Sequence, residues 1–459
     1  MRYLLLGAAL LALVPGGAQA QRQAPPAPGQ PKDFRLPPRQ IVQLPNGLSL
    51  SLVRYGTVPK VAVSVAIGTG SIDEAPDAVQ LSGLTAALLL EGTTTRSGAD
   101  ISREAADMGG AISADAGTDQ VVVGGEVLSE YAARFVTLLA DVLQHPRFAV
   151  ADVERLKASR VRDNAIALAT PQEQARQDFR RLVLGDHPYA RIYASESMLK
   201  GYTAEAVRDF YASNVGARRA RVYVSGVFDG AAVERAVRAA LGGWGSGPPP
   251  SVRPPTPVTT RQFDVIDRPG AVQSTCWIGL AVTDPTSADW IKLTVTDALL
   301  GGTFGSRITR NIREDKGYTY SPFSVLWVRP RTALWIELAD VTTAVTGASL
   351  KEIFAEVERL RSEAPPPAEL NGIENNLAGF FVIQNNSRQG VIRQLQFVDQ
   401  HGLGDAYLAR YVRNVRAVTA DQVQQTARQY LDPSRMTIAV VGDRKVIDAQ
   451  LEPYRPKTP

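Results

Sequence analysis

One local pattern occurs twice in this chain, and this duplication limits the possible folds more than any other feature of the sequence. The first copy contains Thr203-Ala204-Glu205-Ala206-Val207, and the second contains Thr419-Ala420-Asp421-Gln422-Val423, 216 residues later (419 − 203). At the same offset (442 − 226), an apolar run that ends at Gly226 corresponds to one that ends at Gly442. Each copy predicts a helix capped by threonine, a loop and a buried strand that ends at glycine. We therefore expect two homologous domains.

A proline-rich segment separates the two copies. Six of the ten residues from Pro248 to Pro257 are proline. Because proline fixes φ and has no amide to donate, this segment can lie in the interior of neither a helix nor a sheet. We interpret residues 245–258 as a linker between an N-terminal domain, residues 41–244, and a C-terminal domain, residues 259–454.

The spacing of apolar residues in the first domain indicates strands and helices in separate groups. A Pro-Asn-Gly turn with alternating leucines after it predicts a hairpin over residues 41–53, and a period of two predicts a third strand over residues 61–67. Helical patterns cover residues 81–91, 129–144 and 150–169. The expected fold class is α+β, with two homologous domains, each a mostly antiparallel sheet packed by helices, joined by the proline-rich linker.

The first twenty residues have the layout of a secretory signal peptide. Arg2 precedes an apolar run that is too short to span a bilayer in the usual way, and Ala18-Gln19-Ala20 offers a small-x-small cleavage site. An uncleaved N-terminal anchor is the alternative. Residues 21–40 contain six prolines among polar residues and are expected to be a disordered leader. If the source is a Gram-negative bacterium, the mature chain is expected in the periplasm.

The chain is poor in the side chains that bind metals. Its 459 residues include three histidines and one cysteine. The histidines, His145, His187 and His401, are at least 42 residues apart (187 − 145), so no two can share a helical face as in His-Glu-x-x-His. Cys276 alone can form neither an intramolecular disulfide nor a cysteine-rich zinc site, and its apolar neighbours indicate a buried strand.

Charge and glycine patterns exclude two further classes of ligand. The net charge of +4, from 50 basic and 46 acidic residues, gives no electrostatic footprint for nucleic acid. The glycines at 301, 302 and 305 are not followed by the lysine and hydroxyl residue of a phosphate-binding loop, so we exclude nucleotide binding. We expect instead a close-packed glycine turn that lets a helix approach its sheet.

The order of the elements, together with four short motifs, resembles the pitrilysin/insulinase family of zinc peptidases. The similarity is strongest to the short members that resemble the mitochondrial processing peptidase, and it extends from about Ile41 to Tyr454. The motifs are Gly70-Ser71-Ile72-Asp73-Glu74, Glu91-Gly92-Thr93, Gly185-Asp186-His187-Pro188-Tyr189 and Arg313-Glu314-Asp315-Lys316-Gly317-Tyr318-Thr319-Tyr320.

The resemblance implies that the zinc motif of active family members is absent here. In those members a helix carries His-x-x-Glu-His, whose histidines bind zinc and whose glutamate activates the metal-bound water. Alignment on the turn that follows this helix places Gly83, Ala86 and Ala87 at the three positions. The third zinc ligand of the family falls at Asp163 or Asn164, in an uncertain register. We therefore expect this chain to bind no metal, and we expect a leucine-packed helix at the motif.

The resemblance also implies that the part of the family's site that binds the substrate is present in this chain. A helix is expected to end near Asp315, with Gly317 as its left-handed terminator and a strand that begins at Tyr320. In the family, an arginine and a tyrosine at the spacing of Arg313 and Tyr320 face the zinc, bind the substrate backbone and help to stabilise the oxyanion. The alternative is an arginine favoured by the helix dipole and a tyrosine at the edge of the core.

These features lead to one leading hypothesis and two alternatives. The leading hypothesis is the zinc-free subunit of a heterodimeric periplasmic peptidase, which gives Arg313 and Tyr320 to the zinc site of a homologous partner that cleaves peptides or unfolded polypeptides. The first alternative is a non-catalytic scaffold or peptide-binding protein of the same fold. The second is an independent hydrolase, but three scattered histidines provide no nucleophile–base pair. The sequence leaves open the substrate, the partner, and whether the dimer is a homodimer or a heterodimer.

Overall fold

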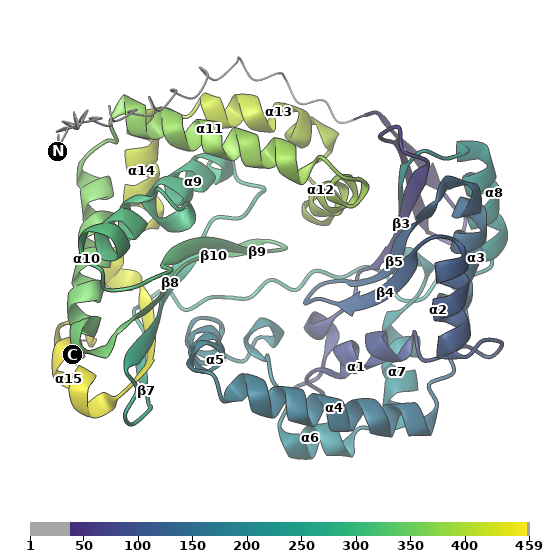
Figure 1. Cartoon of the computed structure of the whole chain (residues 1–459), viewed down its shortest axis with the longest axis horizontal. Helices are drawn as coiled ribbons and strands as arrows, with labels where there is room; N and C mark the ends of the chain where they lie inside the picture. The colour runs from purple at the N-terminus through teal and green to yellow at the C-terminus, as the bar shows by residue number, and fades with distance from the viewer. Residues whose placement is uncertain (1–36, 457–459) are drawn as a thin grey trace, which may run out of the picture. The chain divides into compact units, whose positions relative to one another are not determined.

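The computed structural model describes residues 37–456 of the chain. The predicted signal peptide, residues 1–20, and residues 21–36 of the predicted leader therefore lie outside the described residues. Within the described range, the chain forms two β-sheets with helices packed against them, as Figure 1 shows. None of the helices in that range is long and apolar enough to cross a membrane.

The first sheet has the strand order β1-β2-β6-β3-β5-β4. The predicted hairpin is present, with Val42 opposite Leu50 in an antiparallel pair. Its first strand begins at Arg39, two residues before the expected start of the fold, where the Arg39 guanidinium pairs with Asp399 at 2.9 Å. The strands are β1 (Arg39–Gln43), β2 (Ser49–Arg54), β3 (Lys60–Ile67), β4 (Ala111–Ala116), β5 (Val121–Leu128) and β6 (Ala220–Gly226).

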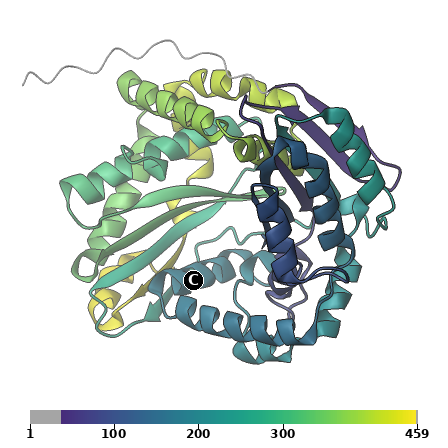
Figure 2. The ribbon, with the colours of Figure 1, turned by 45° about the vertical axis from the view of Figure 1, so that its right-hand side comes forward.

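The second sheet has the order β7-β11-β8-β10-β9 and repeats the order of the first without an equivalent of β1. Its two longest strands, β8 and β10, have 10 and 11 residues. They are antiparallel neighbours and can be followed as the long teal and green strands of Figure 2. The strands are β7 (Phe263–Asp267), β8 (Gln273–Val282), β9 (Phe323–Arg329), β10 (Thr332–Thr342) and β11 (Thr437–Gly442).

The predicted duplication is visible element by element. Helices α7 (Ala204–Asn214) and α14 (Ala420–Tyr430) are offset by 216 residues at both ends (420 − 204 and 430 − 214). The hydroxyls of Thr203 and Thr419 cap them and accept the amide of the third helical residue at 3.1 and 3.3 Å. The strands that follow, β6 and β11, each pair in parallel with one neighbour and antiparallel with the other. All other pairs are antiparallel, which confirms the predicted α+β class.

Helices of the first half follow the predicted periodicity closely. The predicted helix over residues 129–144 starts with a 3₁₀ turn, Ser129–Tyr131, before the α-helix itself. Helices α3 and α8 lie side by side over one face of the first sheet (Figure 1). Phe135 of α3 and Val237 of α8 are fully buried. The remaining bounds are α1 (Leu81–Leu88), α2 (Gly98–Asp107), α3 (Ala132–Gln144), α4 (Val150–Leu168), α5 (Pro171–Leu184), α6 (Glu196–Gly201) and α8 (Gly230–Leu241).

Helices of the second half pack around the second sheet in the same way. Leu350, Ile353 and Val357 of α10 recur at helical spacing and are fully buried. Two segments wind as π-helix, Ala298–Gly302 and Thr309–Asp315. The α-helices are α9 (Trp290–Asp297), α10 (Thr346–Ser362), α11 (Pro367–Gln384), α12 (Arg388–His401), α13 (Asp405–Arg416) and α15 (Arg444–Leu451).

Helices α5 and α12 cross between the two halves. They are equivalent copies, since both their starts and their ends differ by 217 residues (388 − 171 and 401 − 184). Ala175, Phe179 and Val183 of α5 pack against the second sheet, in a core cluster that includes Trp277 and Ala439. The face of α5 with helical spacing is therefore buried by strands of the other half.

The contribution of α12 is reciprocal. Val391 and Leu395 pack against the first sheet, in a cluster with Val53, Ala62 and Tyr223. The hydroxyl of Tyr223 also donates to Asp399 of the same helix at 2.9 Å. Each sheet is thus covered on one face by a helix that belongs, in sequence, to the other half.

The linker runs between the halves without regular structure. Residues 245–258 contain neither helix nor strand, as the prolines predict. They are nevertheless held, because the Arg253 guanidinium donates to Asp73 at 2.7 Å and the Val258 amide donates to the Val183 carbonyl at 2.8 Å. The domain boundaries that we assigned stay a prediction, and they place α5 in the domain whose sheet it does not cover.

Candidate functional site

Helix α1 carries the three positions that align with the zinc motif, and none of their side chains offers a donor atom. Leu84 and Leu88 are fully buried and fasten the helix to the first sheet. Ala86 belongs to the same core, whereas Ala87 is half-buried. Gly83 lines a cavity of about 300 Å³, to which we refer as the motif cavity.

A guanidinium fills the space beside Gly83. Arg160 of α4 reaches toward α1, and one of its terminal nitrogens lies 3.1 Å from the position that a Cβ at residue 83 would take. Burial lowers the pKa of Arg160, and the charges of Asp163 and Glu74 oppose that shift. Neither a hydrogen bond nor an ion pair joins the Arg160 side chain to another residue between positions 37 and 456.

Of the two candidates for the third zinc position, Asn164 and not Asp163 faces α1. Asn164 is buried, and its amide nitrogen donates to the side-chain oxygen of Gln80 at 2.7 Å and to the Ala194 carbonyl at 3.2 Å. The Gln80 amide donates back to Asn164 at 3.1 Å. Asp163 is exposed. The inward position therefore holds a neutral amide that is already engaged.

Neither the three motif positions nor the lining of the motif cavity fits a zinc ion, because Glu74 is the one carboxylate among the described lining residues and none of them is a histidine or cysteine. Zinc needs three or four nitrogen, oxygen or sulfur donors, and Gly83, Ala86 and Ala87 supply none. Arg160 adds a positive charge at the same place. Throughout the described residues, no group of three histidine, cysteine, aspartate or glutamate side chains is arranged to hold a metal ion.

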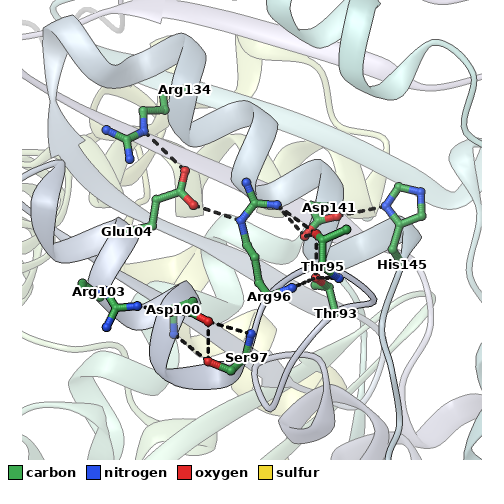
Figure 3. A network of polar contacts seen from close by, with 10 residues as sticks. All are labelled: Thr93, Thr95, Arg96, Ser97, Asp100, Arg103, Glu104, Arg134, Asp141 and His145. Carbon is green, nitrogen blue, oxygen red and sulfur yellow. Dashed lines mark hydrogen bonds and ion pairs between the residues drawn. The ribbon is translucent and has the colours of Figure 1, made fainter.

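The first predicted histidine belongs to a polar network behind the turn that follows α1, shown in Figure 3. His145 contacts Asp141 at 3.1 Å, and Asp141 also accepts from the Arg96 guanidinium at 2.9 Å. Arg96 bridges to Glu104 at 2.9 Å, and its amide donates to the Thr93 hydroxyl at 3.0 Å. The network holds the Glu91-Gly92-Thr93 turn in place. His145 is part of this network through Asp141, and its role is therefore structural.

The other two histidines and the cysteine are also structural. His187 caps a 3₁₀ turn, accepts from the Tyr189 amide at 3.2 Å and donates to the Arg253 carbonyl at 2.9 Å. His401 is buried at the end of α12, and burial lowers its pKa to about 4. Cys276 is fully buried in β8, and burial raises its pKa to about 12. None of the three lines the motif cavity.

The predicted arginine and tyrosine lie where a helix of the second half ends. Arg313 is in the last turn of the π-helix, and Gly317, with φ of 65°, ends that helix in the left-handed conformation that we predicted. Strand β9 begins at Phe323, so the expectation of a strand from Tyr320 was wrong. Pro322 accounts for the later start, because proline has no amide to give to the ladder and confines pairing to the residues after it.

Arg313 and Tyr320 meet in this turn. The centre of the Arg313 guanidinium lies 5.0 Å from the ring centroid of Tyr320 and 4.3 Å from that of Phe304. Tyr320 is 78% exposed and Phe304 is 67% exposed. Together with Phe323 they border a second cavity, of about 350 Å³, to which we refer as the aromatic cavity.

The glycine-rich approach to this helix is close-packed only in its first part. A Cβ at Gly301 would lie 2.6 Å from a carboxyl oxygen of Glu337 and from the hydroxyl of Ser324, whereas one at Gly305 would meet no atom within 4 Å. Glu337 is fully buried, and burial together with the nearby Asp297 raises its pKa. The predicted close-packed glycine turn is therefore present at Gly301 and absent at Gly305.

The structure brings the predicted residues together in two places rather than one. No residue lines both cavities, so the Arg313 and Tyr320 pair is separate from α1 within this chain. Sequence reasoning missed Phe304 and Arg160. An aromatic residue among loop glycines was a usable signal for Phe304, whereas no local pattern indicates that Arg160 faces Gly83.

The fold and these two places define a class of protein, namely a two-domain α+β peptidase homologue whose described residues contain no group of side chains that could hold a metal ion. The family described as Insulinase (Peptidase family M16) matches residues 52–182, and the one described as Peptidase M16 inactive domain matches residues 201–377. The chain belongs to the M16 family, the insulinase/pitrilysin peptidases, as its motifs predicted, and within that family it is of the non-catalytic type.

Bacterial proteins are similar to this chain over most of its length. An uncharacterized zinc protease of Mycobacterium leprae is 25% identical over 432 residues, which cover 89% of this chain and 93% of that protein. A crystal structure of a peptidase M16 inactive domain from Pseudomonas fluorescens has a TM-score of 0.81 at 22% identity and covers 88% of this chain and 98% of its own. A protease structure from Helicobacter pylori has a TM-score of 0.82 at 16% identity, with 89% and 100% covered. The two structures share the fold.

Proposed function

We propose that this chain is the zinc-free subunit of a heterodimeric periplasmic peptidase. In this proposal a homologous partner holds the zinc ion, and this chain contributes Arg313 and Tyr320 to the binding of a peptide or unfolded polypeptide. The periplasmic location rests on the signal peptide predicted over residues 1–20. The family, together with the lack of any group of three metal-binding side chains among the described residues, supports the non-catalytic part of the proposal.

One observation carries the proposal, namely an arginine that is held in place but has no acidic partner. Aromatic rings flank the Arg313 guanidinium, and no carboxylate in the described part of the chain pairs with it. Rings orient a guanidinium without using up its hydrogen-bond donors. The donors of Arg313 and the exposed hydroxyl of Tyr320 are therefore free for a ligand from outside the chain.

The chemistry of the pair suits amide hydrolysis. A guanidinium and a phenol both donate hydrogen bonds to a backbone carbonyl oxygen, and both bonds strengthen when that oxygen becomes negatively charged in the tetrahedral intermediate. Arg313 and Tyr320 would thus bind the substrate and favour the transition state over it. The partner subunit would supply the metal and the attacking water.

A free strand edge beside the aromatic cavity offers a way to hold the peptide. Strand β9 is outermost in its sheet, and β10 is its one partner among the described strands. Its first residue, Phe323, lines the aromatic cavity. A peptide that adds to this edge as a further strand would pass Tyr320 and Arg313, because they line the same cavity as Phe323. Main-chain pairing would let the edge accept peptides of many sequences.

The test is to reconstitute the complex. The chain is co-expressed with a homologue of similar length that carries His-x-x-Glu-His, and the purified complex is assayed for cleavage of an unfolded polypeptide. Arg313→Ala and Tyr320→Phe are each expected to lower kcat/KM by about 10²-fold, the typical cost of one oxyanion donor. Size-exclusion chromatography shows whether each variant still forms the complex.

Matched control variants separate the site from general effects. Arg235→Ala removes an exposed arginine of α8 that has no ion pair among the described residues, and Tyr131→Phe removes a hydroxyl at the start of α3. Both controls are expected to stay within about twofold of the unchanged complex. Equal cleavage by the intact complex and by the Arg313→Ala/Tyr320→Phe complex would contradict the proposal and favour the scaffold or peptide-binding alternative.

A further inference from the structure

The motif cavity has an unusual concentration of positive charge in its lining. Glu74 is the one carboxylate that lines it among the described residues. The arginines come from two helices, a loop and the end of a strand. They are Arg160 of α4, Arg176 and Arg180 of α5, Arg191, and Arg329 of β9.

The carboxylate of Glu74 does not pair with these arginines. Its oxygens accept from the Ser82 amide at 2.8 Å, from the Ser82 hydroxyl at 2.5 Å and from the Gln80 amide at 2.8 Å. Arg191 donates to the backbone carbonyl of Glu74, at 2.9 Å, and not to the carboxylate. The carboxylate of Glu74 is therefore hydrogen-bonded to the start of α1 and has no direct contact with an arginine.

Two of the arginines have no carboxylate in direct contact, although the charges of Glu74 and Asp163 act on Arg160, and that of Glu173 on Arg180, from a distance. Like Arg160, Arg180 forms no ion pair and no hydrogen bond with a residue that the structure describes, and its guanidinium centre lies 4.6 Å from the ring centroid of Trp327. Burial lowers the pKa of Arg180 to about 9, and the neighbouring charges of Arg176 and Arg329 act in the same direction. Partly buried cations without a direct partner are costly, and this cavity contains two.

Two of the other cations are balanced from outside the cavity, whereas Arg191 has no ion pair among the described residues and donates to the carbonyls of Asp186 and Glu74. Arg176 pairs with Glu173 on its own helix. Arg329 lies 3.6 Å from Asp119 and stacks on the same Trp327 ring, at 4.5 Å from its centroid. The local excess of charge therefore rests on Arg160, Arg180 and Arg191. The guanidinium groups of Arg160 and Arg180, which come from different helices and border one space, have no hydrogen bond to a described residue.

We propose that the motif cavity binds a small oxyanion, a carboxylate or phosphate group, with Arg160 and Arg180 as the cations that receive it. Guanidinium forks match the planar and tetrahedral oxygens of these groups and bind them in a bidentate manner. A volume of about 300 Å³ accommodates a phosphate or a small dicarboxylate. The proposal stands apart from the proposed function, because it needs neither a partner subunit nor zinc.

The test uses the full chain without a partner. Inorganic phosphate and succinate are titrated by calorimetry at constant ionic strength, and saturable one-to-one binding is expected. Arg160→Gln and Arg180→Gln are each expected to weaken that binding about tenfold or more, since each removes a charge-assisted contact. Because each substitution also removes a partly buried charge that has no direct partner, the variants are expected to melt no lower than the unchanged protein without ligand. The melting temperature thus separates lost binding from lost folding.

Further binding measurements identify the source of the anion. A peptide with one glutamate is compared with its glutamine counterpart, which distinguishes an acidic side chain from a free anion. Arg235→Gln serves as the charge-matched control and is expected to bind like the unchanged protein. The proposal is overturned if phosphate, succinate and the glutamate peptide all fail to bind saturably. It is equally overturned if the Arg160→Gln/Arg180→Gln variant binds them as tightly as the unchanged protein.

Discussion

Gly83 and Arg160 form a complementary pair, because the absence of a side chain at one makes room for the guanidinium of the other. A terminal nitrogen of Arg160 already lies 3.1 Å from the position of a Cβ at residue 83. A longer side chain there must displace the guanidinium or meet it. The site thus differs from a zinc site by the presence of a cation as well as by its missing ligands.

Restoration of the motif alone is therefore expected not to restore zinc binding. The combination Gly83→His, Ala86→Glu and Ala87→His supplies two imidazoles, but Arg160 repels the ion and the amide of Asn164 is a poor third ligand that already pairs with Gln80. We expect clearly substoichiometric zinc in the purified variant, measured by mass spectrometry of the metal content after dialysis against a zinc buffer.

Two further substitutions serve as the positive control for that experiment. Arg160→Ala removes the competing charge, and Asn164→Glu supplies a carboxylate on the face of α4 that points to α1. Their addition is expected to raise the zinc content toward one ion per chain. One zinc per chain in the variant without them would show that the register or the role of Arg160 is wrong.

At the residue scale, the sequence could indicate the lost motif but not what replaced it. Gly83, Ala86 and Ala87 follow from a local spacing to the Gly92-Thr93 turn. Arg160 is 77 residues from Gly83 (160 − 83), and the packing of α4 on α1 alone brings them together. Contacts between residues so far apart in sequence depend on the tertiary structure, and no periodic pattern in the sequence indicates them.

At the scale of elements, local patterns predicted the helices and strands with small errors at their ends. Strand β9 starts three residues after Tyr320 because Pro322 interrupts the apolar run, and a 3₁₀ turn precedes α3. The amphipathic face of α5 was also readable in the sequence. The sheet against which α5 packs could not be predicted, because a stripe of apolar residues shows that one face of the helix is buried but not which sheet buries it.

The packing of α5 on the second sheet gives an element-scale prediction. Phe179 is fully buried, its ring centroid lies 5.8 Å from that of Trp277, and its ring tip would lie 3.0 Å from a Cβ at Gly279. Phe179→Ala leaves a cavity between the helix and the other half, so we expect it to lower the free energy of unfolding by about 3–5 kcal/mol. Urea denaturation followed by tryptophan fluorescence measures the change.

A neighbouring position controls for the helix itself. Gln177→Ala changes a residue of α5 that lies outside the core cluster and whose side chain has no hydrogen bond to a described residue. It is expected to change stability by less than about 0.5 kcal/mol. A loss below about 1 kcal/mol for Phe179→Ala would mean that α5 does not fasten the two halves together.

At the scale of the whole molecule, the duplication in sequence explains why the crossing of helices is reciprocal. Helices α5 and α12 are equivalent copies. Because α5 of the first half packs on the second sheet, α12 of the second half packs on the first sheet in the same way, as in the self-complementary interface of a symmetric dimer. The 216-residue offset predicted two homologous domains, but it could not reveal this exchange, because a repeat in sequence specifies the units and not how they dock. The halves are therefore held by two buried helix faces in addition to the linker.

Cleavage of the linker should then leave the molecule assembled. Val252 is 57% exposed, so a recognition sequence for a specific protease, inserted between Ser251 and Val252, is accessible in the folded protein. After complete cleavage we expect a single peak of unchanged mass in size-exclusion chromatography under native conditions and two peaks in urea, because the buried faces of α5 and α12 keep their partners without a covalent link. Separation of the fragments under native conditions would show that the linker, and not the exchanged helices, holds the halves together. The same cleavage in a Phe179→Ala/Leu395→Ala variant, which weakens both faces at once, is expected to release the fragments and so connects the assembly to these two helices.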